Sequence, residues 1–461
     1  MKTKKTITDS TVDPDILAYT VGDDPVLDRD LVVWDAMGTA AHVTMLSEMK
    51  LKRPVVTKAE AARVRRELGR IAAQAEKGAF EIRVDDQDVH MAVERVLTER
   101  LGDLGKKIHT GRSRNDQVAV DVRLHMKDAI LRTEAELVGL ASQLGAFGCA
   151  SGPIPLVGRT HLQPAMPSSV EMWATGHAEM ILDQLENLEA AYRLADANPL
   201  GSAAGYGVPL PLDRDRTTKL LAFARPIHNC FGASMARGEC EAALLSALAQ
   251  LMAVLSRLAE DLILFSMPEF AYFKLPRAYC TGSSIMPQKF NPDVLELVRS
   301  KAAQVLGLQT AALSLLHAMP GGYNRDLQDC KGLYMKGLVL TRTTLRILTK
   351  VVAGLTVDAD RCRAAFTPGV FATDVALAKV ADGMPWRDAY HAVRDQFAAL
   401  YDGRPAEVAS IDPDAAVAAK RHAGATGGID HALYRRREAA ALKRVAARLD
   451  ALLSARKALF A

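Results

Sequence analysis

Residues 281–294, which read TGSSIMPQKFNPDV, gather many groups able to do chemistry into one short segment. One glycine and two prolines make a helix or strand improbable there and favour a loop of fixed shape. The loop offers the hydroxyl of Ser283, the ammonium of Lys289 and the amide of Asn291. These donors suit an anionic ligand, so the segment is a candidate site, with a capped surface loop as the alternative.

Three further polar segments stand far from it in the chain. They are HTGRSRNDQ at 109–117, GRTHLQPAMP at 158–167 and GGYNRDLQDCK at 321–331. In the first, Arg112 and Arg114 cannot both be buried without partners, which leaves two interpretations. The segment is either a solvated turn or a turn that binds carboxylates through guanidinium forks and backbone amides.

Histidines within these patterns carry two interpretations each. A lone histidine is usually structural, but His161 has Thr160 before it and Gln163 two positions later. His177 falls on an apolar helical stripe, as a satisfied bundle histidine or as part of a proton network. His90 lies one residue after the polar run at 85–88, which would open a helix, either as part of an ordinary helix start or, with Asp88, near the active site.

The elements that must position these groups are predicted to be helices. Of 461 residues, 49% are hydrophobic and only 5% aromatic, which favours an all-α fold. Long helices are predicted at 118–144 (ending near Gly145 and Gly148), 168–195, 292–317 and 327–353, and the leucine spacing between 244 and 265 is typical of a bundle seam. We predict an N-terminal helical domain at 1–112, a central bundle at 113–364 and a C-terminal domain of smaller helices at 365–461.

Composition excludes several function classes. A net charge of +4 without a dense basic run argues against nucleic-acid binding. The apolar stretch at 242–265 is interrupted by four polar or charged residues, which argues against a membrane span. Six cysteines without a CxxC pair predict reduced thiols and no metal site, and Lys2, Lys4 and Lys5 are not followed by an apolar stretch, so we expect a cytoplasmic protein without a secretory signal.

The segment at 281–294 resembles the GSSxMPxKxNP signature of the fumarase/aspartase superfamily, which also includes the delta-crystallins. With HTGRSRNDQ, GRTHLQPAMP and YNRDLQ added, the chain resembles the argininosuccinate lyase family within it. The resemblance implies three mostly helical domains whose long central helices build a homotetramer around a twenty-helix core. It also implies active sites that are each shared by three chains.

The resemblance implies a reaction as well: anti elimination of argininosuccinate to L-arginine and fumarate, the last step of arginine biosynthesis, without metal or organic cofactor. Ser283 and His161 match the acid and base, Glu296 matches the acid that orients His161, and Lys289 and Asn291 match the groups that stabilise a carbanion. Matches to substrate-binding positions are Ser113, Asn115, Thr160, Tyr323, Gln328 and Lys331, with Arg112 and Arg114 supporting the same turn. Asp88, His90 and His177 match positions that support those residues.

Two questions stay open at this point. Either Ser283 or His161 can be the base; our hypothesis is Ser283, with its alkoxide held by loop amides and nearby positive charge, and His161 as the acid. Departures from the family pattern, at Asp24 in place of a serine and at Arg159, Phe290 and Cys330, leave room for another fumarate-releasing lyase. A noncatalytic structural homologue is the other alternative, but it predicts loss of catalytic residues that are all present here.

Overall fold

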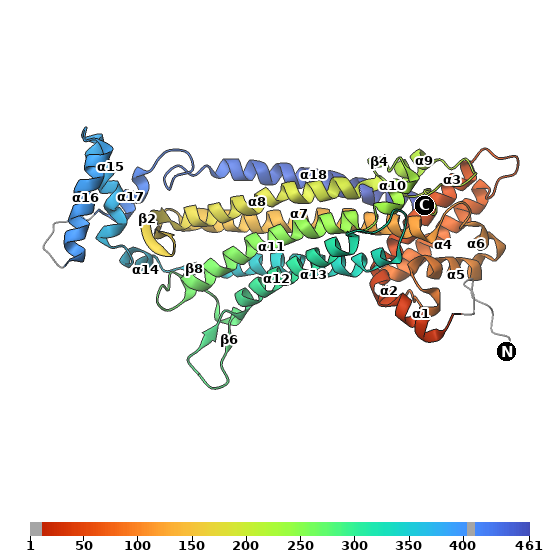
Figure 1. The fold of residues 1–461 in the computed structure, drawn as a ribbon, viewed down its shortest axis with the longest axis horizontal. Helices are drawn as coiled ribbons and strands as arrows, with labels where there is room; N and C mark the ends of the chain where they lie inside the picture. The colour runs from red at the N-terminus through yellow and green to blue at the C-terminus, as the bar shows by residue number, and fades with distance from the viewer. Residues whose placement is uncertain (1–11, 403–410) are drawn as a thin grey trace.

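A bundle of long helices forms the body of the molecule. The computed structural model describes residues 12–402 and 411–461, so Lys2, Lys4 and Lys5 lie outside the described residues. In Figure 1 the long helices run side by side along the length of the molecule. They are α7 (Arg114–Ser151), α8 (Val170–Ala195), α11 (Glu239–Ser266), α12 (Asp293–Leu316), α13 (Cys330–Gly354) and α18 (His431–Phe460).

Shorter helices cover one end of this bundle. They are α1 (Pro14–Val21), α2 (Asp24–Leu27), the 3-10 helix η1 (Asp28–Leu31), α3 (Val32–Glu48), α4 (Lys58–Glu76), the 3-10 helix η2 (Val84–Asp86), α5 (Val89–Leu101) and α6 (Asp103–Lys107). A capping box starts α4: the Thr57 hydroxyl accepts from the Glu60 amide, and the Glu60 carboxylate accepts from the Thr57 amide. The same end holds α9 (Arg214–Leu220), α10 (Cys230–Met235) and the parallel pair β3 (Ala197–Asn198) and β4 (Arg225–Pro226).

The opposite end carries the remaining short elements. Antiparallel pairs are β1 (Pro155–Thr160) with β2 (Gln163–Ser169), β5 (Phe273–Lys274) with β8 (Thr356–Val357), and β6 (Thr281–Gly282) with β7 (Phe290–Asn291). The helices there are α14 (Ala359–Ala364), α15 (Ala372–Ala381), α16 (Trp386–Tyr401) and α17 (Pro413–Ala419). The 3-10 turns η3 (Arg277–Tyr279) and η5 (Pro368–Phe371) also lie there, whereas η4 (Arg325–Gln328) lies at the first end, where Arg325 donates to the Thr20 carbonyl.

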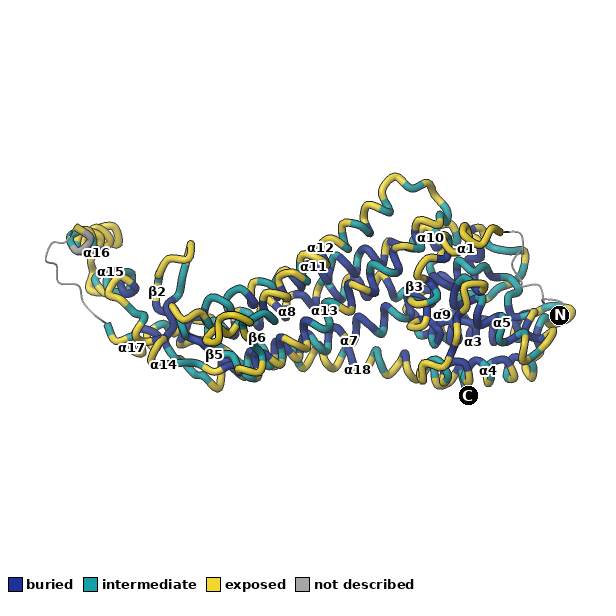
Figure 2. The backbone as a smooth tube through the Cα atoms, turned by 90° about the horizontal axis from the view of Figure 1, so that it is seen from below, coloured by how far each residue is buried: buried dark blue, intermediate teal, exposed yellow. Residues whose placement is uncertain are grey.

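The all-α prediction is confirmed, and the leucine seam is its clearest part. Every seam position of α11 from Leu244 to Phe265 is buried, because the helix packs against α8, α12 and α13. By length and composition alone α11 could cross a membrane, but 67% of its most apolar window is buried inside the molecule. Figure 2 shows this burial concentrated along the inner faces of the bundle. Helix α11 is therefore a core helix, as its interrupted apolar run predicts.

Two predicted helices differ from the observed ones. The first of the long helices, α7, begins at Arg114 rather than 118, because Ser113 and Asp116 form a capping box, and it continues past Gly145 and Gly148 to Ser151. The expectation of smaller helices through Ala461 is wrong for the last part of the chain. There α18 spans 30 residues and returns along α7 to reach α3 and α4. The three domain boundaries stay a prediction.

Candidate active site

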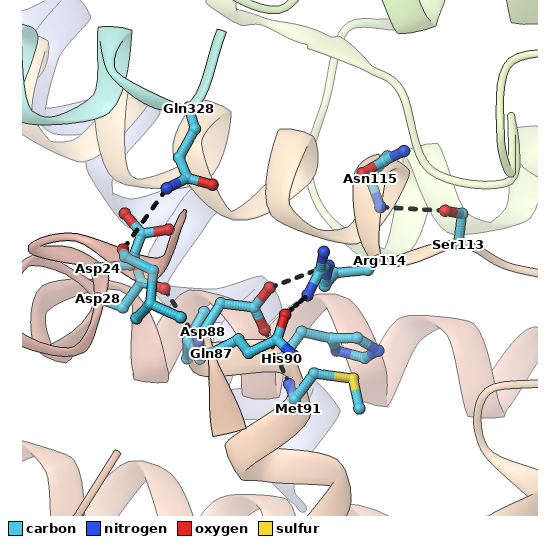
Figure 3. A network of polar contacts seen from close by, with 12 residues as sticks. Asp24, Asp28, Gln87, Asp88, His90, Met91, Ser113, Arg114, Asn115 and Gln328 are labelled. Carbon is cyan, nitrogen blue, oxygen red and sulfur yellow. Dashed lines mark hydrogen bonds and ion pairs between the residues drawn. The ribbon is translucent and has the colours of Figure 1, made fainter. Parts of the chain in front are cut away.

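Several predicted site residues meet in a small, partly enclosed cavity where α7 begins, called the α7 cavity below. Its lining includes the predicted residues Asp88, Arg114, Asn115, Tyr323 and Gln328, together with Asp24, Gln87, Val118, Arg237 and Arg325. These come from five stretches of the sequence: α2, the two residues before α5, the start of α7, the segment between α10 and α11, and the segment between α12 and α13. Figure 3 shows Asp24, Asp88, Arg114, Asn115 and Gln328 on neighbouring elements around one space.

The start of α7 presents Arg114 and Asn115 to this cavity. The Ser113 hydroxyl accepts a hydrogen bond from the Asn115 amide at 3.2 Å, and the Asp116 carboxylate accepts one from the Ser113 amide at 2.8 Å. The Arg114 Nη1 donates to Gln87 Oε1 at 2.9 Å and its Nε lies 3.3 Å from Asp88 Oδ2. A fixed guanidinium and a helix N-terminus suit a carboxylate ligand, which favours the anion-binding interpretation of this turn.

Gln87 sits in a backbone conformation that non-glycine residues rarely adopt. Its φ is 68° and its ψ is −40°. Next to it, Asp88 caps α5 by accepting from the Met91 amide at 3.0 Å. The strained residue and the cap together fix both oxygen acceptors that hold Arg114, and strain of this kind gathers at functional sites.

Two predicted substrate-binding residues are buried and have partners within the chain, and for Arg112 these partners bind Nη1 but leave Nε and Nη2 without a hydrogen bond among the described residues. Arg112 donates through Nη1 to the Thr39 hydroxyl at 3.0 Å and to Gln117 Oε1 at 2.6 Å, so it supports the turn from inside. Lys331 has a side chain only 1% exposed and forms ion pairs with Asp24, at 2.8 Å, and with Asp28. Lys331 is therefore already neutralised from within the chain.

Burial sets the electrostatics beneath the cavity. Desolvation raises the pKa of Asp28 to about 6, although Lys331 opposes the shift. Arg237 is also buried, and burial alone would lower its pKa, but Tyr323, Glu241, Asp24 and Asp28 nearby raise it. Arg237 thus stays charged at the edge of the cavity.

His90 lies behind the cavity wall in a chain of buried polar groups. Its Nδ1 is 3.0 Å from Asp35 Oδ2 and its Nε2 is 3.2 Å from His109 Nδ1, while Glu94 lies 3.6 Å from the same His109 nitrogen. The ligand atoms of His90, Glu94 and His109 all lie within 4.8 Å of one another, so they could hold a metal ion. Both His90 nitrogens already have partners, however, and an ion would have to replace the bond between the two rings. We interpret this row of polar side chains as a support for the turn that follows His109.

Thr160 and His161 lie at the exposed tip of the β1–β2 hairpin. Because Thr160 pairs with Gln163, His161 and Leu162 form a two-residue turn, and both have positive φ, 53° and 62°. The Arg159 guanidinium donates to the Leu162 carbonyl at 3.0 Å and lies over the Phe270 ring, 4.8 Å from its centroid. The family departure at Arg159 therefore stiffens the tip that carries His161.

Ser283 lies in the exposed loop between β6 and β7. Its Oγ accepts hydrogen bonds from the backbone amides of Ile285, at 3.3 Å, and Met286, at 3.0 Å. Lys289 is exposed on the same loop, Asn291 is half-buried, and Glu296 is exposed in the first turn of α12. The loop projects from the bundle in Figure 1, and two amides directed at one hydroxyl oxygen would stabilise negative charge on it.

The chain keeps these regions apart. Within the described residues no hydrogen bond or ion pair joins His161, Ser283 or Glu296 to one another or to the α7 cavity. His177 stands separately on α8, with Nε2 2.9 Å from an Asp261 oxygen that also accepts from Trp173 at 2.9 Å. The structure therefore assembles one part of the predicted site and leaves the reacting groups on separate exposed tips.

Sequence reasoning did not find Gln87 or Arg237. Gln87 differs from any other glutamine only through its backbone angles, which no pattern announces. Arg237 stands just before α11 in the string MARGEC, where an arginine before a glycine predicts only a helix start. Their roles arise from tertiary packing around Tyr323 and Arg114.

Comparison with known proteins decides the family. A family described as lyase matches residues 27–307. An argininosuccinate lyase of Sorangium cellulosum is 42% identical, over 90% of this chain and 94% of its own length. One of Xanthomonas euvesicatoria is 41% identical, over 88% of this chain and 93% of its own. The chain belongs to the argininosuccinate lyase family.

Solved structures agree with the fold expected of an argininosuccinate lyase. EDDS lyase in complex with formate has a TM-score of 0.80 at 23% identity, with 98% of this chain and 95% of that chain covered. A class II fumarase from Schistosoma mansoni has a TM-score of 0.72 at 16% identity, with 87% and 93% covered. At these identities the likeness concerns the fold alone, and it matches the superfamily resemblance read from the sequence.

Proposed function

We propose that the protein cleaves argininosuccinate to L-arginine and fumarate by acid/base-catalysed anti elimination, in the last step of arginine biosynthesis. The observation that carries the proposal is the pairing of this family membership with the Ser283 hydroxyl, whose oxygen accepts two backbone amides. An alkoxide at this position is stabilised by the same amides, so Ser283 acts as the base. Intact catalytic residues disfavour a noncatalytic homologue.

The other predicted site residues stabilise the charge that develops after proton removal, protonate the leaving group or hold the substrate. Proton removal leaves a carbanion whose charge spreads into the neighbouring carboxylate, where Lys289 and Asn291 supply a cation and a donor. His161, oriented by Glu296 of another chain, protonates the leaving guanidino nitrogen. Ser113, Asn115 and Thr160 hold the carboxylates of the succinyl part, and Tyr323 and Gln328 lie at the arginine end. No metal or organic cofactor takes part.

We infer a cytoplasmic homotetramer in which three chains build each site. Only four of the 24 residues of α12 are buried, and its exposed apolar residues include Leu297, Leu306 and Leu313, at 53%, 56% and 48% exposure. Val339 on α13 is 65% exposed. Apolar helix faces of this extent call for protein partners. Association along them would bring the Ser283 loop and the His161 tip of other chains to an α7 cavity.

The test follows fumarate by its ultraviolet absorbance after the protein is mixed with argininosuccinate, adenylosuccinate, malate or aspartate. We expect fumarate from argininosuccinate alone. Fumarate from one of the other three compounds would instead favour a sister lyase. No fumarate from any of them, in a folded tetramer, would favour the noncatalytic homologue.

A further inference from the structure

A second group of chemically active side chains lies outside the lining of the α7 cavity. His90 and Glu94 stand four residues apart on α5, so they share one face of that helix. His109 comes from the segment between α6 and α7 and meets them there. Its Nδ1 lies 3.2 Å from His90 Nε2 and 3.6 Å from Glu94 Oε2. Two imidazoles and a carboxylate therefore converge from two separate parts of the chain.

The Glu94 carboxylate is buried and forms no hydrogen bond with the described residues. Glu94 is 7% exposed, and within residues 12–402 and 411–461 its one ion pair is the 3.6 Å contact with His109. The cation that acts on it from further away is the buried Arg112 guanidinium, which also attracts Asp35 and Asp116. Carboxylates thus outnumber the guanidinium here, and a buried carboxylate in such surroundings favours a second positive charge.

His90 is oriented as metal-binding histidines are. Its Nδ1 lies 3.0 Å from Asp35 Oδ2, and both side chains are fully buried. An ionised carboxylate only accepts hydrogen bonds, so Nδ1 carries the hydrogen and the lone pair of the neutral ring is on Nε2. A carboxylate behind the other nitrogen is the usual outer contact of a histidine that binds a metal. His90 Nε2 is thus presented toward His109 as a ligand atom.

We propose that His90, His109 and Glu94 bind a zinc ion. Tetrahedral zinc with bonds of about 2.0 to 2.1 Å places its ligand atoms about 3.3 to 3.4 Å apart, and the observed 3.2 and 3.6 Å separations lie on either side of that spacing. All three ligand atoms lie within 4.8 Å of one another, and a small movement of the Glu94 side chain completes the site. The ion takes the place of the hydrogen shared by the two rings. Because the His109 side chain is 37% exposed, water can occupy the fourth position.

The ion acts as a cross-link between parts of the chain. It joins α5 to the segment that leads into α7, and it takes no part in elimination, so the zinc site does not rest on the proposed function. The three ligands come together only in the folded chain, and the ion therefore stabilises that state. Zinc should raise the midpoint of thermal unfolding by roughly 2 to 5 °C when its free concentration is about a hundred times the dissociation constant.

The test titrates zinc into the full chain after chelator treatment, without a histidine tag and with the exposed thiol removed by Cys149→Ser. Competition with a zinc indicator dye measures binding, and we expect one ion per chain with a dissociation constant below roughly 10 µM. Glu94→Gln keeps the side-chain shape but removes the anionic ligand, and His109→Asn removes an imidazole. Each should weaken binding by more than the roughly 10- to 100-fold that loss of an outer contact costs. Each should also abolish the rise in the unfolding midpoint.

Matched controls change the same residue types outside the cluster. Glu99→Gln alters an exposed glutamate of α5, and His422→Asn alters an exposed histidine; both should bind zinc as the unaltered site does. Chemical modification of histidines by diethyl pyrocarbonate, read by mass spectrometry, tests the site without any substitution in it. An imidazole that binds zinc through Nδ1 carries hydrogen on Nε2 and has no lone pair left to react. Zinc should therefore protect His109 and leave His422 reactive.

Several outcomes would overturn the zinc site. Equal affinity in the parent protein, Glu94→Gln and His109→Asn would show an adventitious ion only, and so would weaker binding in His422→Asn alone. Absence of an ion bound at the expected affinity would also refute it. If both cluster variants fail to fold, the modification experiment decides, because a His109 that zinc leaves reactive contradicts the site. None of these measurements needs turnover, so fumarate release from argininosuccinate tests the proposed function separately.

Discussion

Functional groups are positioned differently in the α7 cavity and at the two exposed tips, which are the β1–β2 turn with His161 and the β6–β7 loop with Ser283. In the cavity, Arg114 is fixed by Gln87 and Asp88, and Lys331 by Asp24 and Asp28. These contacts come from distant parts of one chain. The cavity is therefore preorganised for recognition before any partner arrives.

At the tips, by contrast, the reacting groups are held mainly by residues close to them in sequence. Ser283 is bonded to amides two and three residues further along, and His161 is displayed by a two-residue turn. Neither touches the cavity. The difference supports our proposal that the groups for binding and for chemistry lie apart within one chain and are brought together by assembly.

The largest expected effect comes from the exposed loop. Ser283→Ala removes the group that we assign as base, so kcat should fall by about 10²- to 10⁴-fold, as for loss of a positioned acid or base. Ser284→Ala, which changes the exposed neighbouring hydroxyl, should stay near wild type. Fumarate release measures both variants. Continued exchange of the succinyl proton with solvent in Ser283→Ala would show that another group is the base.

The next prediction tests whether the tips of different chains meet. Inactive His161→Ala and Ser283→Ala proteins, mixed under subunit exchange, should regain activity, because some sites then draw both intact residues from different chains. Random exchange in a symmetric tetramer would make about a quarter of the sites complete. Absence of recovery, with exchange proven by differently tagged subunits, would place both residues of a site on one chain.

Asp28, which is buried beneath the α7 cavity, should make the stability of the protein depend on pH. Its folded-state pKa of about 6 lies above the ordinary 3.8, so the stability that it contributes is complete below pH 3.8 and is lost as pH rises to about 6. The free energy of unfolding should fall by at most roughly 3 kcal/mol over that window. Asp28→Asn should flatten this slope in urea unfolding at fixed protein concentration, whereas Asp30→Asn, at an exposed position, should not. An unchanged slope in Asp28→Asn would refute the assignment.

The smallest expected effects concern Gln87. Gln87→Gly relieves a positive φ but removes an acceptor of Arg114, so unfolding should cost about 1 kcal/mol more while KM rises by roughly fivefold. Gln87→Ala removes the same acceptor and keeps the strain. It should match the rise in KM without the gain in stability; a gain in both variants would mean that the backbone is not strained there.

The sequence predicts the core of the fold because leucine spacing alone determines which face of α11 is buried. It mispredicts α18 because arginines and alanines there obscure a sparse apolar stripe of Ala441, Val445, Leu452 and Leu459. It starts α7 four residues late because the string that looks like a polar turn also contains a Ser-x-x-Asp capping box. Local pattern thus fails where polar residues serve structure.

The candidate site, too, has features that local sequence motifs predict and features that only tertiary packing determines. Motifs predict that Ser283 and His161 stand on shaped loops, since glycine, proline and turn chemistry are local. They cannot predict that Lys331 pairs with two carboxylates or that Arg237 Nε is buried without a hydrogen bond among the described residues. Those facts depend on which helices meet, and only the folded chain determines that.

The return of α18 has a consequence for how the chain is made. This helix packs against α3, α4 and α7, and Phe460 lies 3.3 Å from the position that a side chain at Gly69 would occupy. Arg456 reaches back to Glu76 at 2.7 Å. During synthesis the first helices therefore leave the ribosome long before the segment that closes over them exists. Until then their apolar faces need transient cover, and the N-terminal end of the molecule is among the last to become native.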